Sequence, residues 1–170
     1  MAIENERDED AGEGRVPQMP AGFVAILSTT EDGLDCDSLV AADITGLADV
    51  APEDPEPEFV SINGEGEIVV TLQENNHMVV LNRAGEVLSH FSAGEVTLES
   101  IDTEEEGALV FDQSLTWPRE PDAVTWIDDT HFATANEGDM DGGTRGWTIF
   151  AQDGTVVYEA GTSFEEAIIQ

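Results

Sequence analysis

Short runs of apolar and β-branched residues, separated by turn formers, dominate the hydrophobic pattern of the chain. In the first half these runs cover residues 59–63, 67–72, 77–81 and 86–91. Between them lie turn sequences such as Asn63-Gly64-Glu65-Gly66. Four short strands joined by tight turns within about 35 residues predict an antiparallel meander, which is also the unit of a propeller blade.

The second half of the chain repeats this order. Apolar runs recur at 123–127, 131–135, 147–150 and 155–159. Pro57-Glu58-Phe59-Val60 aligns with Pro121-Asp122-Ala123-Val124, and the turn at Glu74 aligns with Glu137, 63 residues later. An acidic insert over residues 95–117 separates the two copies. A repeat with a fixed order of strands and turns indicates blades or a solenoid array.

A third, partial copy lies at the start of the chain, where residues 2–6 and 22–27 supply strand-like segments and the first, inner strand is missing. The predicted fold class is therefore all-β, with about three blades of an incomplete β-propeller built from four-stranded antiparallel meanders. The remaining blades of the same propeller are the expected partners. The predicted divisions are a partial first blade with acidic loops (1–56), a second blade plus the insert (57–120), a third blade (121–161) and the start of a further blade (162–170).

Charge narrows the set of partners. The chain has 38 acidic and 5 basic residues and a net charge of −33, so its surface repels nucleic acid and anionic lipid. Two interpretations stay open, namely the acidic coat of a halophilic protein and a binder of polyvalent cations. No apolar run reaches membrane-spanning length, and residues 1–6 do not resemble a signal peptide.

The repeated stretches resemble a known family, the secreted bacterial propellers called choice-of-anchor I proteins, which are close to the "esterase-like activity of phytase" and alkaline-phosphatase-like propellers. The stretches that carry the resemblance are PEFVSIN (57–63), VTLQENN (70–76), REPDAV (119–124) and ATANEGD (133–139). Members of this family are longer and begin with a secretion signal. The resemblance thus implies a fragment of an extracellular or cell-envelope protein, with an activity that a shared fold does not fix.

Acidic residues recur at one kind of position in the predicted blades. The turn between the second and third strands of a blade lies on the same rim as the entry to its first strand, so these acids should converge near the axis. Hard oxygen ligands gathered there suit Ca²⁺, or Mg²⁺ if several waters remain. In the alternative reading the same acids cap turns and face solvent. The candidate metal ligands are Glu58, Glu74, Asp122, Glu137 and Asp139, joined by Glu6 from the partial blade.

Other polar residues give weaker signals. Arg145 could contact a phosphate or carboxylate, or it could neutralise neighbouring aspartates. The histidines His77, His90 and His131 have no second ligand at zinc spacing. His77 could act as an acid or base, or simply cap the end of a strand. The residues identify no catalytic group.

Two functions follow as expectations. The favoured one is a non-catalytic propeller for binding or display of a cell-surface ligand, with an acidic rim that binds calcium. The alternative is part of a metal-dependent, phytase-like phosphoesterase or esterase-like hydrolase, in which a cation would bridge carboxylates and a phosphoester substrate. Phosphate substrates need positive charge beyond the metal, and this chain offers only Arg145 and Arg119 for that purpose.

Overall fold

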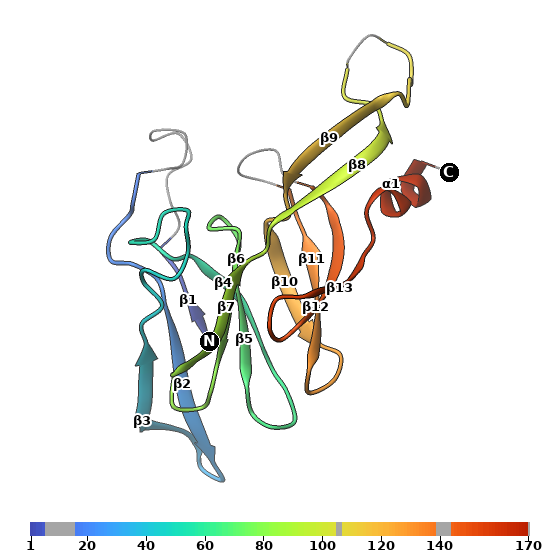
Figure 1. The fold of residues 1–170 in the computed structure, drawn as a ribbon. Coiled ribbons are helices and arrows are strands. Elements are labelled where there is room, and N and C mark those ends of the chain that lie inside the picture. Colours follow the sequence, from blue (N-terminus) through green and yellow to red (C-terminus); the bar gives the residue numbers. More distant parts are fainter. Residues whose placement is uncertain (6–15, 105–106, 139–143, 170) are drawn as a thin grey trace.

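The structure is a computed structural model that describes residues 1–5, 16–104, 107–138 and 144–169 (Figure 1). It is all-β apart from one short helix. The elements are β1 (Ala2–Ile3), β2 (Phe23–Thr30), β3 (Gly33–Ala42), β4 (Pro57–Ile62), β5 (Ile68–Leu72), β6 (His77–Leu81), β7 (Val87–Ser92), β8 (Glu95–Ile101), β9 (Gln113–Pro118), β10 (Pro121–Trp126), β11 (His131–Asn136), β12 (Gly146–Ala151), β13 (Val156–Glu159) and α1 (Thr162–Ile169).

The strands form antiparallel sheets in which chain order is also spatial order. The first sheet is β1-β2-β3, the middle sheet is β4-β5-β6-β7, and the last sheet is β10-β11-β12-β13. A separate two-stranded arm, β8-β9, links the middle and last sheets. Figure 1 shows the three sheets side by side, with the middle sheet between the other two. The two four-stranded meanders predicted from the sequence are confirmed.

The two central strands of the middle sheet, β5 and β6, are buried on both faces. Val70 and Leu72 of β5 pack against the first sheet, whereas the alternate residue Val69 packs against the last sheet with Met78 and Val80 of β6. Successive side chains of a strand point to opposite faces, so a strand covered on both sides needs apolar residues at nearly every position. This explains the apolar runs of β5 and β6, in which the polar residues are Thr71 and His77.

Aromatic rings fill the interface between the middle and last sheets. The ring of Phe132 lies 5.2 Å from that of Trp126 in an edge-on arrangement and 6.0 Å from that of Phe150. Phe91 of β7 completes the cluster, 5.6 Å from Phe150. Gly154, with φ +90°, lies so close to Phe91 that a Cβ there would be 2.7 Å from the ring. Aromatic packing of this kind adds to the burial of apolar area.

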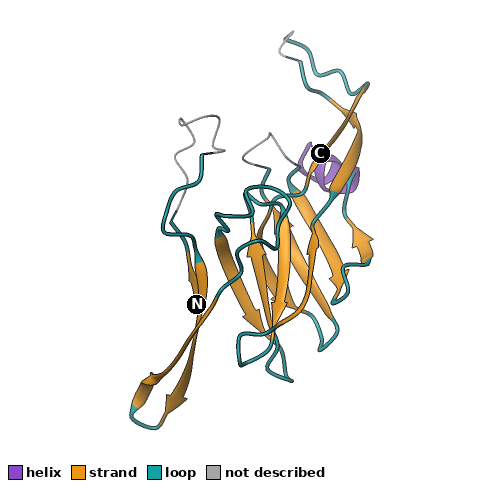
Figure 2. Ribbon diagram, turned by 60° about the vertical axis from the view of Figure 1, so that its left-hand side comes forward, coloured by secondary structure: helices purple, strands orange, loops and turns teal. Residues whose placement is uncertain are grey.

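The edge strands at one side of the three sheets come together. β10 contacts both β4 and β5, and β1 contacts β4. The sheets are therefore close along one common edge. Figure 2, turned by 60°, shows the middle and last sheets stacked and the arm β8-β9 projecting beyond them.

Two segments differ from the sequence expectation. Residues 33–42, predicted only as part of the acidic loops, form strand β3, whose acidic residues conceal the strand pattern. The acidic insert over 95–117 contains the arm, in which Val96, Leu98 and Ile101 form a small cluster with Leu115.

The described part of the chain ends in a short helix. Residues 162–170 are predicted as the start of a further blade, and Thr162–Ile169 of this segment form helix α1. At the start of the helix the Ser163 hydroxyl donates a hydrogen bond to the Ala160 carbonyl at 2.5 Å. The helix packs beside the arm, where the Glu99 amide donates a hydrogen bond to Thr162 Oγ1 at 3.0 Å.

Candidate functional site

The strand pairing shows which turns lie beside the entries to β4 and β10. Pro57, at the entry to β4, pairs with Leu72 at the end of β5, and Pro121, at the entry to β10, pairs with Asn136 at the end of β11. The acids that follow these prolines therefore lie beside the turns that follow β5 and β11. This end of the sheets, the upper end in Figure 1, is called the acidic rim below.

Asp122 and Glu137 of the last sheet come together on the acidic rim. Burial raises the pKa of the Asp122 carboxyl, and the nearby charge of Glu137 raises it further. Gln73 of the middle sheet donates a hydrogen bond from Nε2 to Glu137 Oε2 at 2.5 Å. Thr71 Oγ1 donates to the backbone carbonyl of Asp122 at 2.6 Å. Two carboxylates thus share a small region where the middle and last sheets meet.

The pairing register corrects the sequence alignment of the two copies. Since Leu72 and Asn136 hold the same place opposite Pro57 and Pro121, the residue equivalent to Glu137 is Gln73, and not Glu74. The buried apolar residues support this equivalence. Phe132 of β11 packs against the middle sheet, just as Ile68 of β5 packs against the first sheet. The acids of these two turns therefore do not occupy the same position in the repeat.

The other residues of the predicted site differ in burial and in their place along the strands. Glu58 is half-buried at the start of β4, Glu74 is buried in the turn after β5, and Arg145 is exposed just before β12. Asp139 and Glu6 lie outside the described residues. Within the described ranges, no three His, Cys, Asp or Glu side chains are arranged to hold a metal ion. The calcium site stays a prediction.

Sequence reasoning missed a second pair of acids on the acidic rim. Glu56 and Glu120 directly precede Pro57 and Pro121, hold equivalent positions in the two copies, and are 1% and 3% exposed. Glu120 also has a positive φ of 44°, which non-glycine residues rarely adopt. The repeated Glu-Pro dipeptide was the available signal.

The amide side chains in the VTLQENN stretch connect neighbouring sheets and loops. Asn75 Oδ1 accepts a hydrogen bond from the Glu56 amide at 2.9 Å, and its Nδ2 donates to the carbonyl of Val50 at 3.0 Å. Asn76 Oδ1 accepts from the Glu120 amide at 3.0 Å, while its Nδ2 donates to the Gly94 carbonyl at 3.1 Å. These side chains satisfy backbone groups where the chain passes from one sheet to the next.

Arg119 has a structural role that reduces its availability for an anion. Its Nε donates to Glu159 Oε2 at 2.7 Å, and its Nη1 donates to the Ala93 carbonyl at 2.6 Å. The guanidinium carbon lies 5.9 Å from the centre of the Phe150 ring. The side chain therefore joins the crossover after β7 to the last strand, β13.

Two histidines that are distant in sequence lie side by side. Val79 of β6 pairs with His90 of β7, and this register brings His77 Nε2 within 3.1 Å of His90 Nδ1. His77 is buried, and burial, with a contribution from His90, lowers its pKa to about 4, against a small opposing effect of Asp49. His77 is therefore a buried neutral imidazole and more than a simple cap at a strand end.

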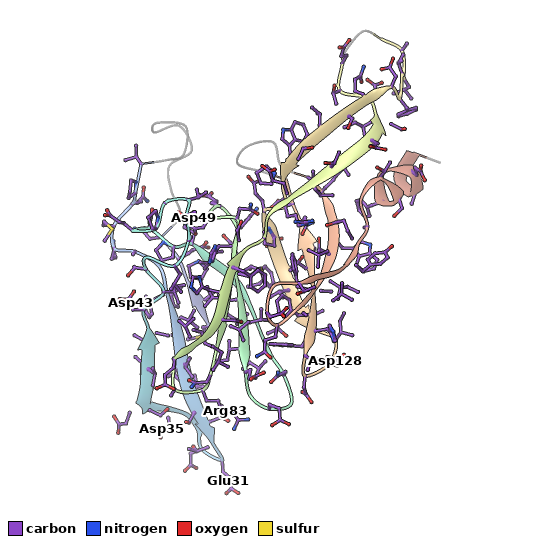
Figure 3. All side chains as sticks on the ribbon, viewed as in Figure 1. Glu31, Asp35, Asp43, Asp49, Arg83 and Asp128 are labelled. Atoms are coloured by element: carbon purple, nitrogen blue, oxygen red, sulfur yellow. The ribbon has the colours of Figure 1, made fainter. Side chains whose placement is uncertain are left out.

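The opposite end of the sheets carries a separate hollow of about 280 Å³, which is small for a ligand site. Figure 3 shows Asp128 at this lower end, far from Asp49 at the upper end. Hydrogen bonds from the hydroxyl and amide of Thr130, and from His131, hold the pKa of Asp128 below its ordinary value. The lining residues are Ile62, Asn63, Gly64, Trp126, Ile127, Asp128 and Asp129.

The fold and its acidic rim define an all-β protein made of successive antiparallel meanders. The family model of the Choice-of-anchor I domain matches residues 28–142, which is more than half of the chain, and the chain belongs to this family. The match contains every candidate acid from Glu58 to Asp139. A search of curated proteins found no match.

Family membership suggests a cell-surface or anchor-related protein with a surface or extracellular location. Within the described part of the chain, no helix combines the length and apolar character needed to cross a membrane. The phytase-like and alkaline-phosphatase-like properties that the sequence resemblance implied stay predictions.

Proposed function

We propose that this chain is part of a non-catalytic, surface-exposed β-propeller that binds or displays a ligand, and that its acidic rim binds Ca²⁺. Each of the three sheets would be one blade, with β4 and β10 as inner strands and the first sheet lacking its inner strand. The support is the common edge at which β1, β4 and β10 approach one another. Sheets that share one edge and stack face to face in chain order are arranged as propeller blades are.

The proximity of Asp122 and Glu137 is the observation that carries the cation proposal. The negative charge of Glu137 disfavours ionisation of Asp122, so a bound cation would stabilise both carboxylates in their charged form. Calcium accepts mixed carboxylate, carbonyl and water ligands in flexible geometry. Glu58, Glu74 and Asp139 are the further acids that would complete the coordination.

A binding role is favoured over hydrolysis because most polar side chains near the acidic rim have structural partners. Asn75 and Asn76 hold backbone groups, and Arg119 pairs with Glu159. A phosphoesterase would need cationic groups directed at the substrate, and its remaining candidate is Arg145. The acidic surface suits a cation or a basic ligand better than a phosphate ester.

Calorimetric titration with CaCl₂ in molar KCl tests the cation proposal, because monovalent salt suppresses binding that depends only on the bulk charge. Glu137→Gln and Asp122→Asn should each weaken Ca²⁺ binding strongly. Asp153→Asn removes an exposed carboxylate from the turn between β12 and β13 and should leave the affinity unchanged. Equal affinities for all three variants and the wild type would refute a site on the acidic rim.

A further inference from the structure

Two of the three histidines form a cross-strand pair on one face of the middle sheet. Val79 of β6 packs in the core between the first and middle sheets, and it pairs with His90 of β7. Paired residues of antiparallel strands point to the same face, so His90 lies on the face of Val79. Alternate residues of one strand also share a face, which places His77 there too. The two imidazole rings therefore lie on one face of the sheet, although 13 residues separate them in the sequence.

The separation of the two imidazole nitrogens is that of two ligands on one metal ion. His77 Nε2 lies 3.1 Å from His90 Nδ1, and the ring centres are 5.3 Å apart. Imidazole binds zinc at about 2.0–2.1 Å, so two such nitrogens at neighbouring positions of a tetrahedral or square-planar ion are about 2.9–3.4 Å apart. Without a metal the same two atoms form a hydrogen bond, in which an N–H of one ring donates to the lone pair of the other.

The two rings differ in their freedom to move. His77 is 3% exposed and is held in place by its surroundings, whereas His90 is exposed on strand β7. The His90 ring is therefore free to turn until both lone pairs point at one ion, and its solvent side leaves room for water ligands. Burial also lowers the pKa of His77 to about 4, so at neutral pH this ring is in the unprotonated form that binds metals.

The charges around the pair favour a cation. Asp49, at the upper end of the sheets in Figure 3, acts electrostatically on His77, and the chain as a whole has a net charge of −33. A metal on His77 Nε2 leaves the ring proton on Nδ1, which is buried and has no hydrogen-bond partner among the described residues. The negative charge of Asp49 stabilises a ring in that state, but the unpaired N–H weakens binding. We therefore expect a much lower affinity than that of a structural zinc site.

We propose that His77 and His90 together bind one divalent transition-metal ion of the kind that prefers imidazole, such as Ni²⁺, Cu²⁺ or Zn²⁺. Within the described ranges no third His, Cys, Asp or Glu side chain completes a metal site, so water fills the remaining positions. Calcium takes oxygen ligands, and these ions take imidazole nitrogen. The histidine site is therefore distinct from the calcium site proposed for the acidic rim, and its ion would join strand β6 to strand β7.

Calorimetric titration of the whole chain with NiCl₂ in molar KCl at neutral pH gives the first test, because the salt suppresses binding to the bulk charge. His90→Gln changes an exposed residue and should weaken Ni²⁺ binding by at least about 10-fold. His131→Gln is the matched control, because His131 contacts Asp128 at the lower end of the sheets, and it should leave the affinity unchanged. Equal affinities for His90→Gln and the wild type, or a loss caused by His131→Gln, overturn the proposal.

Electron paramagnetic resonance of the chain with one equivalent of Cu²⁺ identifies the ligand atoms. We expect hyperfine coupling to two nitrogens in the wild type and in His131→Gln, and to fewer nitrogens in His90→Gln. A wild-type spectrum that shows oxygen ligands alone overturns the proposal. Glu137→Gln separates the two cation sites, because it should leave Ni²⁺ binding unchanged while it weakens Ca²⁺ binding at the acidic rim. A parallel loss of Ni²⁺ binding in Glu137→Gln would place the ion at the rim and also overturn the histidine site.

Discussion

Replacing Arg119 by Met tests how strongly the polar contacts at the acidic rim hold the middle and last sheets together. The substitution keeps an unbranched apolar side chain over Phe150 and removes two charged hydrogen bonds, to Glu159 and to the Ala93 carbonyl. It also leaves the carboxylate of Glu159, about one-fifth exposed, without its cation. Breaking a buried ion pair by removing one partner costs about 3–5 kcal/mol. Because Glu159 is partly exposed, we expect the free energy of unfolding to fall by the lower value of this range, ~3 kcal/mol.

Urea denaturation in molar KCl measures this loss, and a double-mutant cycle isolates its cause. With a denaturant slope of about 1–3 kcal/mol per molar urea, a loss of ~3 kcal/mol should lower the midpoint of Arg119→Met by roughly 1–3 M at unchanged slope. Glu159→Gln removes the charge and keeps the acceptor of the Thr148 hydroxyl. The double variant should therefore lose less than the sum of the single variants, by about 1–2 kcal/mol.

Arg83→Met is the matched control, because Arg83 is an exposed arginine at the lower end of the sheets (Figure 3). The Arg83→Met substitution should change the free energy of unfolding by no more than about 0.5 kcal/mol. If Arg119→Met destabilises no more than this control, or if the two losses in the cycle are simply additive, the ion pair does not connect the sheets as described.

Three further predictions follow from the same contacts. The pKa of His77 is lowered to about 4 in the folded chain, so the unfolded state binds a proton at His77 more readily. The contribution of neutral His77 to the free energy of unfolding should therefore be lost as pH falls from about 6.5 to 4, by up to ~3 kcal/mol. Urea titrations at pH 7 and 4.5 should show a smaller fall in the free energy of unfolding for His77→Gln than for the wild type. Glu137→Gln should lower the pKa of Asp122 toward its ordinary value without reaching it, because burial remains, and carboxyl carbon NMR titration measures this; an unchanged pKa would contradict the proximity of the two acids. Gly154→Ala should destabilise the chain more than Gly46→Ala, because both glycines have positive φ (+90° and +78°) but only the Cβ at 154 meets an aromatic ring of β7; equal urea midpoints for the two variants would count against that contact.

The meanders were predictable because their turns carry clear signals. Strand β6 was predicted with its observed bounds, and β5 and β11 to within one residue. Gly66 and Gly85, which close the turns after β4 and β6, have the positive φ that such turns require. The arm β8-β9 and strand β3 were missed, because acidic residues on an exposed face interrupt the apolar runs that reveal a strand.

The one-residue error in the repeat has a physical cause. A strand covered on one face alternates apolar and polar residues, and that alternation fixes its register. β5 is buried on both of its faces and apolar except for Thr71, so sliding it by one residue changes little in the sequence pattern. Only the pairing of Pro57 with Leu72 and of Pro121 with Asn136 shows that Gln73 corresponds to Glu137.

This correction changes what the acidic rim can do. If Glu74 and Glu137 were equivalent, each sheet would contribute one carboxylate to a regular ring of acids. Instead, Gln73 of one sheet donates a hydrogen bond to Glu137 of the next, so an amide occupies the place of the repeated acid and orients its neighbour. The carboxylate that remains beside Glu137 is Asp122, whose raised pKa records their proximity. The cation binding proposed for this rim would therefore depend on the contact between two successive sheets, and any change that separates the middle and last sheets should weaken it.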